Sequence, residues 1–237
     1  MTTAAERRSG ADAEAGGDAR HSASAPSPVP RFIAFEGPEG GGKSTQIRAI
    51  AAALAAAGVA HIVTREPGGT TIGEQIRAIL LGTENRAMVP KTEALLLVAA
   101  RAQHVAEVIE PALARGELVL CDRFAGATFA YQGYGRGLPL AELRQLQAFA
   151  AGVLIPDLTL LFDLPVEIGL ARRQAAGDVN RLDAAGLDFH RAVRRGYLEL
   201  ADDDPARWRI IDATRPLAEV RAETLAIVEQ WLRVSLG

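Results

Sequence analysis

A glycine-rich segment that ends in a lysine and a serine could bind a chain of phosphate groups. Residues 37–44 read Gly-Pro-Glu-Gly-Gly-Gly-Lys-Ser, the pattern G-x-x-x-x-G-K-[ST], and follow the apolar run Phe32–Phe35. Glycines let successive backbone N–H groups approach phosphate oxygens, and a helix that begins after the loop points the positive end of its dipole at the same anion. Lys43 adds a positive charge and Ser44 a hydroxyl suited to Mg²⁺. The segment therefore predicts a nucleotide phosphate site.

Charged or polar clusters follow four of the five apolar runs that predict strands. The runs are Phe32–Phe35, His61–Thr64, Leu118–Cys121, Leu158–Phe162 and Arg209–Ile211. Arg65 follows the second run and Arg123 the third, and further arginines, Arg172, Arg173 and Arg181, lie beyond the fourth. A single arginine in such a place is typical of a surface ion pair. Because parallel strands end at one edge of a sheet, several arginines there indicate an anionic ligand.

Helical spacing of alanine and leucine separates these runs, as a parallel sheet wrapped by helices requires. The helical segments are Ser44–Ala57, Gly73–Leu81, Thr92–Arg115, Leu140–Ala151, Val166–Gln174, Asp188–Ala201 and Leu217–Val234. The pattern predicts an α/β fold with three α/β/α layers around a five-stranded parallel sheet.

The composition excludes several classes of protein. The chain has 237 residues, 49% of them hydrophobic and 23% charged, which fits one α/β domain. A net charge of −3 gives no bulk attraction to nucleic acid or to an anionic membrane, and no apolar run is long enough to span a bilayer. The single cysteine, Cys121, cannot form an intrachain disulfide, and it lies in an apolar run that favours a buried thiol. We therefore expect a cytoplasmic protein with a small anionic ligand.

Residues 1–30 differ in composition from the rest of the chain. They are rich in Ala, Gly, Ser and Pro and show no apolar periodicity, which predicts a disordered N-terminal tail. Residues 31–237 are then expected to form one P-loop domain, with a mobile lid segment at about 172–185.

Taken in order, the motifs of the chain resemble those of the bacterial thymidylate (dTMP) kinases, a family of P-loop nucleoside monophosphate kinases. The resemblance runs from about residue 31 to the C-terminus. Besides the P-loop it rests on Arg-Glu-Pro-Gly-Gly-Thr at 65–70, Thr-Glu-Ala at 92–94, Ala-Ala-Arg-Ala-Gln-His at 99–104, Asp-Arg-Phe at 122–124, Ala-Tyr-Gln-Gly at 130–133, Pro-Asp-Leu-Thr at 156–159 and Asn-Arg-Leu-Asp at 180–183. The P-loop alone indicates only the superfamily, whereas the Arg-Glu-Pro-Gly-Gly-Thr and Asp-Arg-Phe blocks are far more specific. The resemblance implies phosphorylation of dTMP to dTDP by ATP with Mg²⁺, in dTTP biosynthesis, by a homodimer.

The resemblance also implies sets of site residues. The ATP phosphates are expected to bind to Gly37, Pro38, Glu39, Gly40, Gly41, Gly42, Lys43, Ser44 and Thr45, with Ser44 and Asp122 near Mg²⁺. The expected catalytic residues are Lys43, Asp122, Arg123 and Arg181. The expected dTMP-binding residues are Glu39, Glu66, Arg77, Leu97, Arg101, Arg123, Thr128, Tyr131 and Gln132.

Individual roles follow from the same resemblance. Glu39 is expected near the sugar 3′-hydroxyl and Arg123 on the dTMP phosphate. Arg101 is expected to donate to a thymine carbonyl, while Thr128 and Gln132 supply polar groups near the base and its phosphate. The ring at position 131 is expected to crowd a ribose 2′-hydroxyl and so to favour deoxynucleotides.

Two positions depart from the family pattern. Leu97 stands where the family usually has a phenylalanine that stacks on thymine, and its spacing fits either a base contact or an ordinary core residue. The second departure is the lid segment, which is only modestly basic. We expect one of its arginines, Arg172, Arg173 or Arg181, to contact the transferred phosphoryl group.

His61 and His104 fall inside predicted elements and are expected to be structural.

Other classes of P-loop protein remain as alternatives. A GTPase would carry Asn-Lys-x-Asp, which this chain lacks because its only lysines are Lys43 and Lys91. A non-catalytic nucleotide-binding protein would not need the block at 122–132. Another nucleoside monophosphate kinase, or a nucleoside kinase with Glu36 or Glu66 as general base, is the nearest enzymatic alternative.

Overall fold

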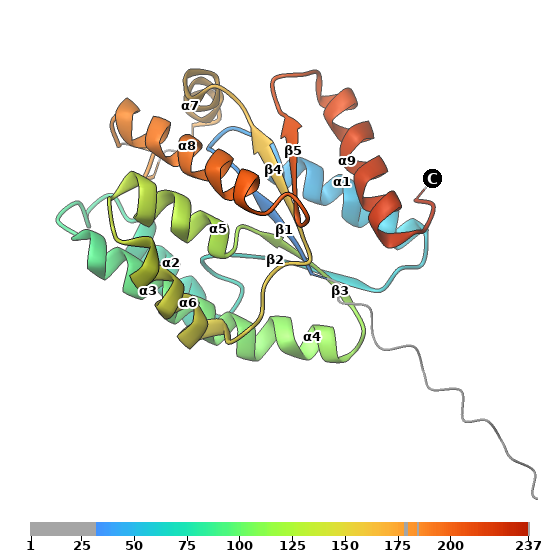
Figure 1. Ribbon diagram of the computed structural model, residues 1–237, viewed down its shortest axis with the longest axis horizontal. Coiled ribbons are helices and arrows are strands. Elements are labelled where there is room, and N and C mark those ends of the chain that lie inside the picture. The colour runs from blue at the N-terminus through green and yellow to red at the C-terminus, as the bar shows by residue number, and fades with distance from the viewer. Residues whose placement is uncertain (1–31, 178–179, 184, 237) are drawn as a thin grey trace, which may run out of the picture.

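The computed structural model describes residues 32–177, 180–183 and 185–236. The tail predicted for residues 1–30 therefore lies outside the described residues. A five-stranded parallel sheet with strand order β2-β3-β1-β4-β5 forms the centre of the domain (Figure 1). Helices cover both of its faces, so the predicted three-layer α/β fold is confirmed.

All five predicted strands are present, and each is slightly longer than its apolar run. The strands are β1 (Phe32–Glu36), β2 (His61–Arg65), β3 (Leu118–Asp122), β4 (Leu158–Asp163) and β5 (Trp208–Asp212). The added residue at each carboxyl end is charged and still belongs to the sheet. Asp122 is in register with Phe35 of β1 and with Arg65 of β2, and Asp163 with Asp212. The sheet thus places charged side chains in a row along one edge.

The helices account for most of the remaining chain. They are α1 (Lys43–Ala56), α2 (Thr71–Leu81), α3 (Pro90–His104), η1 (Val105–Ile109), α4 (Glu110–Ala114), α5 (Ala125–Thr128), η2 (Phe129–Gly135), α6 (Leu140–Ala151), α7 (Val166–Ala175), α8 (Leu187–Asp203) and α9 (Leu217–Leu232), where η marks a π-helix. The single helix predicted for Thr92–Arg115 is α3, η1 and α4 in succession. Pro111 has no N–H to donate to the preceding turn, and the wider π-helical turn lies just before it.

Residues 125–135 correct the sequence prediction, which assigned no helix there. They form α5 and η2 despite three glycines, which disfavour helix. Packing against α8 compensates for this low propensity. Gly135 lies against Phe189 and Val193, and Gly196 of α8 lies against Tyr134. Helices of this kind depend on tertiary contacts rather than on local sequence.

Alternate residues of β1 face two separate hydrophobic cores. Ile33 and Phe35 of β1 pack towards α1 and α9, whereas Phe32 and Ala34 pack towards η1 and α4. Figure 1 shows α1 and α9 on one side of the sheet and the remaining long helices on the other. This two-sided burial is typical of parallel sheets and holds the strand ends in fixed positions. Within the described part of the chain, no helix is both long and apolar enough to cross a membrane.

Candidate active site

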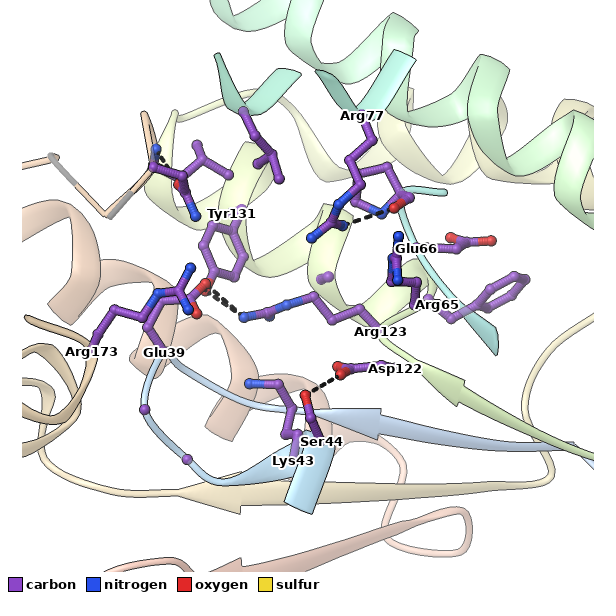
Figure 2. A pocket seen from close by; sticks show the side chains of 18 of the residues that line it. Glu39, Lys43, Ser44, Arg65, Glu66, Arg77, Asp122, Arg123, Tyr131 and Arg173 are labelled. Carbon is purple, nitrogen blue, oxygen red and sulfur yellow. Dashed lines mark hydrogen bonds and ion pairs between the residues drawn. The ribbon is translucent and has the colours of Figure 1, made fainter. Parts of the chain in front are cut away.

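A cavity of about 610 Å³ opens at the carboxyl edge of the sheet. Residues from the P-loop, from the segments after β2 and β3, from α3 and from the 172–182 region line it. Figure 2 shows the Arg123 side chain reaching across this cavity towards Glu39, above Lys43. The structure therefore brings together most of the residues that the sequence assigned to ATP and to dTMP.

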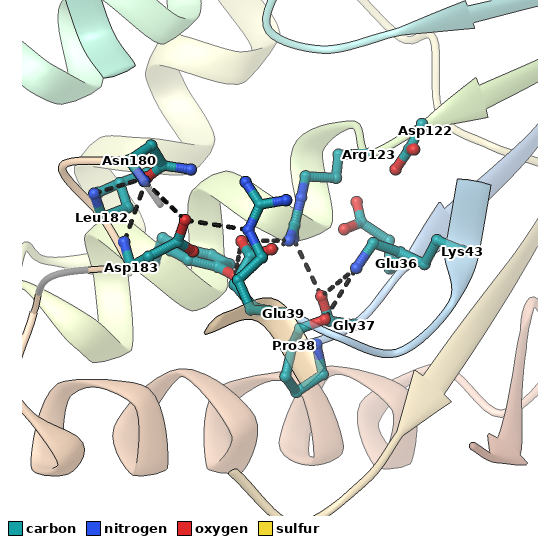
Figure 3. Close-up of polar contacts among 12 residues, drawn as sticks. Glu36, Gly37, Pro38, Glu39, Lys43, Asp122, Arg123, Asn180, Leu182 and Asp183 are labelled. Atoms are coloured by element: carbon teal, nitrogen blue, oxygen red, sulfur yellow. Dashed lines mark hydrogen bonds and ion pairs between the residues drawn. The ribbon is translucent and has the colours of Figure 1, made fainter. Parts of the chain in front are cut away.

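Lys43, the first residue of α1, is turned back over its own loop. Its Nζ donates to the carbonyl oxygens of Gly37 at 3.0 Å and Pro38 at 2.8 Å (Figure 3). Burial, together with the positive charge of Arg123, lowers the pKa of Lys43 to about 8. A phosphate group in the loop would offer this ammonium the counter-charge that the protein supplies only in part.

Ser44 and Asp122 meet at the mouth of the P-loop. The Ser44 hydroxyl donates to Asp122 Oδ2 at 2.8 Å, which joins the start of α1 to the end of β3. Both groups offer oxygen ligands, the type that Mg²⁺ prefers. In the described residues, no group of three or more His, Cys, Asp or Glu side chains could hold a metal ion by itself. The pair therefore suits an ion that takes its other ligands from phosphate and water.

The Arg123 side chain makes four hydrogen bonds within the site. Its Nη1 donates to Gly37 O at 3.0 Å and to the Tyr197 hydroxyl at 2.8 Å. Its Nη2 donates to Glu39 Oε1 at 2.8 Å and to the Tyr131 hydroxyl at 3.1 Å. The residue has φ 71°, a left-handed conformation that costs a non-glycine residue about 1–2 kcal/mol. The four contacts offset this cost and hold the guanidinium beside the P-loop.

Glu39 is the acidic residue inside the P-loop. Besides Arg123, it accepts a hydrogen bond from the Tyr131 hydroxyl at 3.0 Å. Burial of the carboxyl acts to raise its pKa, but Arg123 and Lys43 lower the pKa of Glu39 to about 2. The carboxylate is therefore charged at every working pH and can accept a hydrogen bond from a ligand hydroxyl.

A second buried network holds Arg101. Its Nε donates to Glu66 Oε2 at 2.7 Å, and its Nη2 donates to Thr128 Oγ1 at 3.0 Å. The other Glu66 oxygen bonds to His104 Nδ1 at 3.0 Å, and His104 Nε2 lies 2.6 Å from Thr64 Oγ1. His104 is fully buried, so it supports Glu66 rather than facing the cavity. This ion pair fixes one face of the Arg101 guanidinium and leaves other N–H groups for a ligand.

The remaining residues assigned to dTMP also line the cavity. Arg77 of α2 donates to Pro67 O at 2.8 Å, and the half-buried Leu97 of α3 lies on the same side of the site. Gln132 is almost completely buried, and its Nε2 donates to Glu93 Oε1 at 2.7 Å. Whether Leu97 touches the base stays a prediction, but its place in the cavity lining is compatible with it.

The three candidate lid arginines lie in different surroundings. Arg172 donates to Ala213 O at 2.9 Å, Arg173 donates to Asp183 Oδ2 at 3.0 Å, and both line the cavity. Arg181 is buried and is not among the cavity-lining residues, because its Nη2 donates to Glu93 Oε2 at 2.6 Å. The structure thus brings Arg172 and Arg173 to the site but not Arg181, whose catalytic role stays a prediction. Residues 178, 179 and 184 of the expected lid lie outside the described residues.

The P-loop is in close contact with α7. A Cβ atom at Gly40 would lie 2.2 Å from Gly169 O, and one at Gly169 would lie 2.3 Å from Glu39 O. Real Cβ atoms do not approach backbone oxygens so closely, so both positions require glycine. The loop and the first turns of α7 are therefore packed backbone against backbone.

Sequence reasoning missed the roles of Tyr197 and Glu93. The Tyr197 hydroxyl donates to Glu36 Oε2 at 2.9 Å while it accepts from Arg123, and burial raises the pKa of Glu36. Glu93 accepts hydrogen bonds from Gln132, Arg136 and Arg181. Glu93 belongs to the Thr-Glu-Ala motif at 92–94 that contributes to the family resemblance, but that motif gave it no role, and no signal pointed to Tyr197.

The fold and the site define a class of protein. A parallel sheet, a Gly-rich loop between β1 and α1, and a cation-lined cavity at the strand ends are the features of the P-loop nucleotide-binding proteins. A family profile described as "Thymidylate kinase" matches residues 35–224. The chain belongs to the thymidylate kinase family.

Individual relatives agree with the profile. The chain is 55% identical to a thymidylate kinase of Pseudomonas savastanoi pv. phaseolicola over 206 residues, which cover 87% of this chain and 98% of that protein. It is 53% identical to a thymidylate kinase of Pseudomonas fluorescens over the same shares. It is 54% identical to a thymidylate kinase of Thermomicrobium roseum, with 85% of this chain and 96% of that protein covered.

Proposed function

We propose that the protein transfers the γ-phosphoryl group of ATP to the phosphate of dTMP, giving ADP and dTDP. Membership of the thymidylate kinase family supports this activity. The observation that connects this activity with the site is that the P-loop and the residues assigned to dTMP line the same cavity. Donor and acceptor phosphates would meet there, between Lys43 and Arg123.

The reaction needs cations rather than a base. A phosphate oxygen of dTMP is already anionic at neutral pH, so no proton has to be removed from the nucleophile. The obstacle is repulsion, which is about 4 kcal/mol for two like unit charges 4 Å apart at an effective dielectric of about 20. Lys43 would balance charge on the donor side, and Arg123 would hold and neutralise the acceptor phosphate.

Ser44 and Asp122 are the residues that would hold Mg²⁺. Their oxygen atoms lie 2.8 Å apart beside the P-loop, and an ion bound there would neutralise charge on the ATP phosphates. Thr45 and the backbone of residues 37–42 complete the proposed ATP phosphate site. Lid closure over it, with Arg172 or Arg173 near the transferred group, would exclude water as a competing acceptor.

The acceptor side would recognise the deoxynucleotide through a few fixed groups. Arg101 would donate to a thymine carbonyl, and Thr128 and Gln132 would bind near the base. Tyr131 lies 3.0 Å from Glu39, the residue proposed to approach the 3′-hydroxyl, so its ring stands beside the sugar position. This arrangement supports a preference for sugars without a 2′-hydroxyl.

The structure makes a nucleoside kinase a poor alternative. Such an enzyme needs a carboxylate that can take a proton from a 5′-hydroxyl. Both Glu66 oxygens are bonded to buried Arg101 and His104. Glu36 is buried and accepts from the backbone N–H groups of Phe124 and Ala127 as well as from a tyrosine. Neither carboxylate is available as a general base.

A substrate panel tests the proposal directly. The protein would be assayed for ADP release with ATP and Mg²⁺ and with dTMP, dUMP, UMP, CMP, AMP or thymidine as acceptor. We expect dTMP to give the highest kcat/KM and thymidine to give no turnover. Turnover of thymidine but not of dTMP would refute the proposed reaction, and ADP release without any acceptor would indicate an ATPase.

We also propose that the protein is a cytoplasmic homodimer. The buried free thiol of Cys121 fits a reducing compartment. Ile72 and Ile79 of α2 and Val89 before α3 are large apolar side chains that remain exposed in the single chain, which supports a partner surface there. Sedimentation equilibrium of the purified protein measures the oligomeric state, and a monomer at micromolar concentration would contradict the dimer.

A further inference from the structure

Gln132 carries a buried acceptor atom that lacks a partner. Its side chain is almost completely buried and lines the cavity. Its Nε2 is bonded to Glu93, but Oε1 has no hydrogen-bond partner within the described residues. Buried polar atoms are nearly always paired, so an orphaned acceptor in a ligand cavity indicates that a ligand supplies the donor.

The orientation of the Gln132 amide is set by Glu93. A carboxamide can be turned by half a rotation, which exchanges its acceptor oxygen for its NH₂ donor. An ionised carboxylate only accepts hydrogen bonds, so at 2.7 Å from Glu93 Oε1 the Gln132 side chain must present its nitrogen to Glu93. The oxygen is then the atom left for the cavity.

Glu93 is held in the ionised form by its other neighbours. Arg181 donates to Oε2 at 2.6 Å, and the Arg136 guanidinium lies 3.3 Å from the same oxygen. Burial acts to raise the pKa of Glu93, but hydrogen bonds from Gln132 and Arg181 and the charge of Arg136 lower it. The carboxylate therefore does not switch to a donor at physiological pH.

We propose that Glu93 is a positioning residue that makes the site select pyrimidines with an N3–H group. It acts through Gln132, whose oxygen accepts from N3–H of thymine or uracil, while Arg101 presents N–H groups to a ring carbonyl. Cytosine carries an acceptor at N3 and an amino group in place of that carbonyl. With cytosine bound, two acceptors would face each other at Gln132 and two donors would face each other at Arg101. A site built for one hydrogen-bond pattern rejects the opposite one strongly.

This inference rests on the proposed function and extends it to Glu93, a residue that is not proposed to touch the base. If Glu93 only stabilised α3, its loss would reduce activity on every substrate in the same proportion. If it orients Gln132, its loss changes the ratio between substrates.

The ratio of kcat/KM for dUMP to that for dCMP isolates this effect, because both nucleotides lack the 5-methyl group and differ only at the base edge. In Glu93→Gln, the new carboxamide keeps its oxygen towards Arg181 and turns its NH₂ towards Gln132, which must then rotate. We expect the ratio to fall at least about tenfold from the wild-type value. Glu93→Asp, which withdraws the acceptor from Gln132 but keeps the charge, should lower the ratio as well.

Two further variants complete the test. Gln132→Leu removes the oxygen and should also lower the ratio, whereas Arg136→Gln removes a more distant partner of Glu93 and should leave the ratio unchanged. Parallel losses on dUMP and dCMP in the Glu93 variants, or an unchanged ratio in Gln132→Leu, would overturn the inference. Failure of the wild-type protein to phosphorylate either dTMP or dUMP would instead refute the proposed function.

Discussion

The Arg123 guanidinium donates to the Tyr197 hydroxyl at 2.8 Å, although 74 residues separate them in the chain. The Tyr197 hydroxyl in turn donates to the Glu36 carboxylate. The same carboxylate accepts from the backbone N–H groups of Phe124 and Ala127 at the start of α5. An arginine of the candidate site, a buried tyrosine and a buried carboxylate thus form one chain of hydrogen bonds that joins the end of β3 through α8 to β1.

Removing the Tyr197 hydroxyl should weaken this chain. We expect Tyr197→Phe to lower kcat/KM for dTMP about ten- to hundredfold, because Arg123 loses a fixed partner. The free energy of unfolding should fall by about 1–3 kcal/mol, since a buried carboxylate loses a donor. Steady-state kinetics and urea unfolding measure the two effects. Tyr134→Phe, on the neighbouring π-helix, is the matched control, and wild-type kinetics in Tyr197→Phe would refute the positioning role.

Loss of either central cation should stop phosphoryl transfer. Lys43→Ala and Arg123→Ala are each expected to lower kcat by about 10³-fold or more, because each removes a charge that offsets repulsion between the two substrates. Thermal unfolding followed by circular dichroism checks that the fold is retained. Lys91→Ala removes the only other lysine of the chain, on the exposed surface of α3, and should be fully active. Full turnover by a folded Lys43 or Arg123 variant would contradict the assignment.

The pKa of Lys43, at about 8, predicts that ATP binding takes up a proton at alkaline pH. At pH 8.5 much of the free enzyme carries a neutral lysine, and the ATP phosphates restore its charge. Calorimetry at pH 8.5 in two buffers with different ionisation enthalpies measures the proton uptake. It should vanish in Lys43→Arg, whose charge does not titrate. Equal apparent binding enthalpies in both buffers would contradict the prediction.

The same shift has a consequence for stability. Since the folded-state pKa is lower than the unfolded value of 10.5, the unfolded chain binds more protons between pH 8 and 10.5. Lys43 therefore makes the free energy of unfolding rise with pH across that window, and its burial is most costly below pH 8. The slope of unfolding free energy against pH should decrease in Lys43→Met when measured from pH 8 to 10.

An aromatic ring in place of the leucine side chain at position 97 should improve dTMP binding. Leu97→Phe is expected to lower KM for dTMP about three- to tenfold, because stacking of a base on an aromatic ring contributes about 1–3 kcal/mol and leucine already supplies part of it. Leu217→Phe, at an exposed site on α9, controls for added hydrophobicity. An unchanged or higher KM in Leu97→Phe would show that residue 97 does not face the base.

Alanine variants test which of the candidate lid arginines contribute to turnover. Arg173 lines the cavity, so we expect Arg173→Ala to lower kcat for dTMP about tenfold or more. The sequence-based role of Arg181 predicts a similar loss in Arg181→Ala. Arg181→Ala could instead change the ratio of kcat/KM for dUMP to kcat/KM for dCMP and leave kcat for dTMP unchanged. In that case Arg181 acts through Glu93 and not on the phosphates.

The sequence predicts those parts of the protein that depend on local pattern. Short apolar runs gave the five strands, and the residue after each run proved to be the charged end of the strand. The P-loop could be recognised because its glycines, Lys43 and Ser44 form one motif within eight consecutive residues.

Features that depend on packing between distant segments could not be predicted. The segment 125–135 contains three glycines and is helical only because α8 covers it. Tyr197 has the same helical spacing as its apolar neighbours, and only the fold brings it to Arg123. The ion pair of Arg181 with Glu93 likewise joins residues 88 positions apart, so the sequence alone could not show that Arg181 is not part of the cavity lining.

The contact between Gly40 and Gly169 limits how the proposed lid can move. Because the P-loop and the first turn of α7 touch backbone to backbone, neither can move without disturbing the other. Any movement of the proposed lid must therefore begin beyond Gly169. The first turn of α7 then acts as an anchor, and Arg172 and Arg173, about one turn further along the same helix, mark the earliest point at which the proposed lid can begin to move.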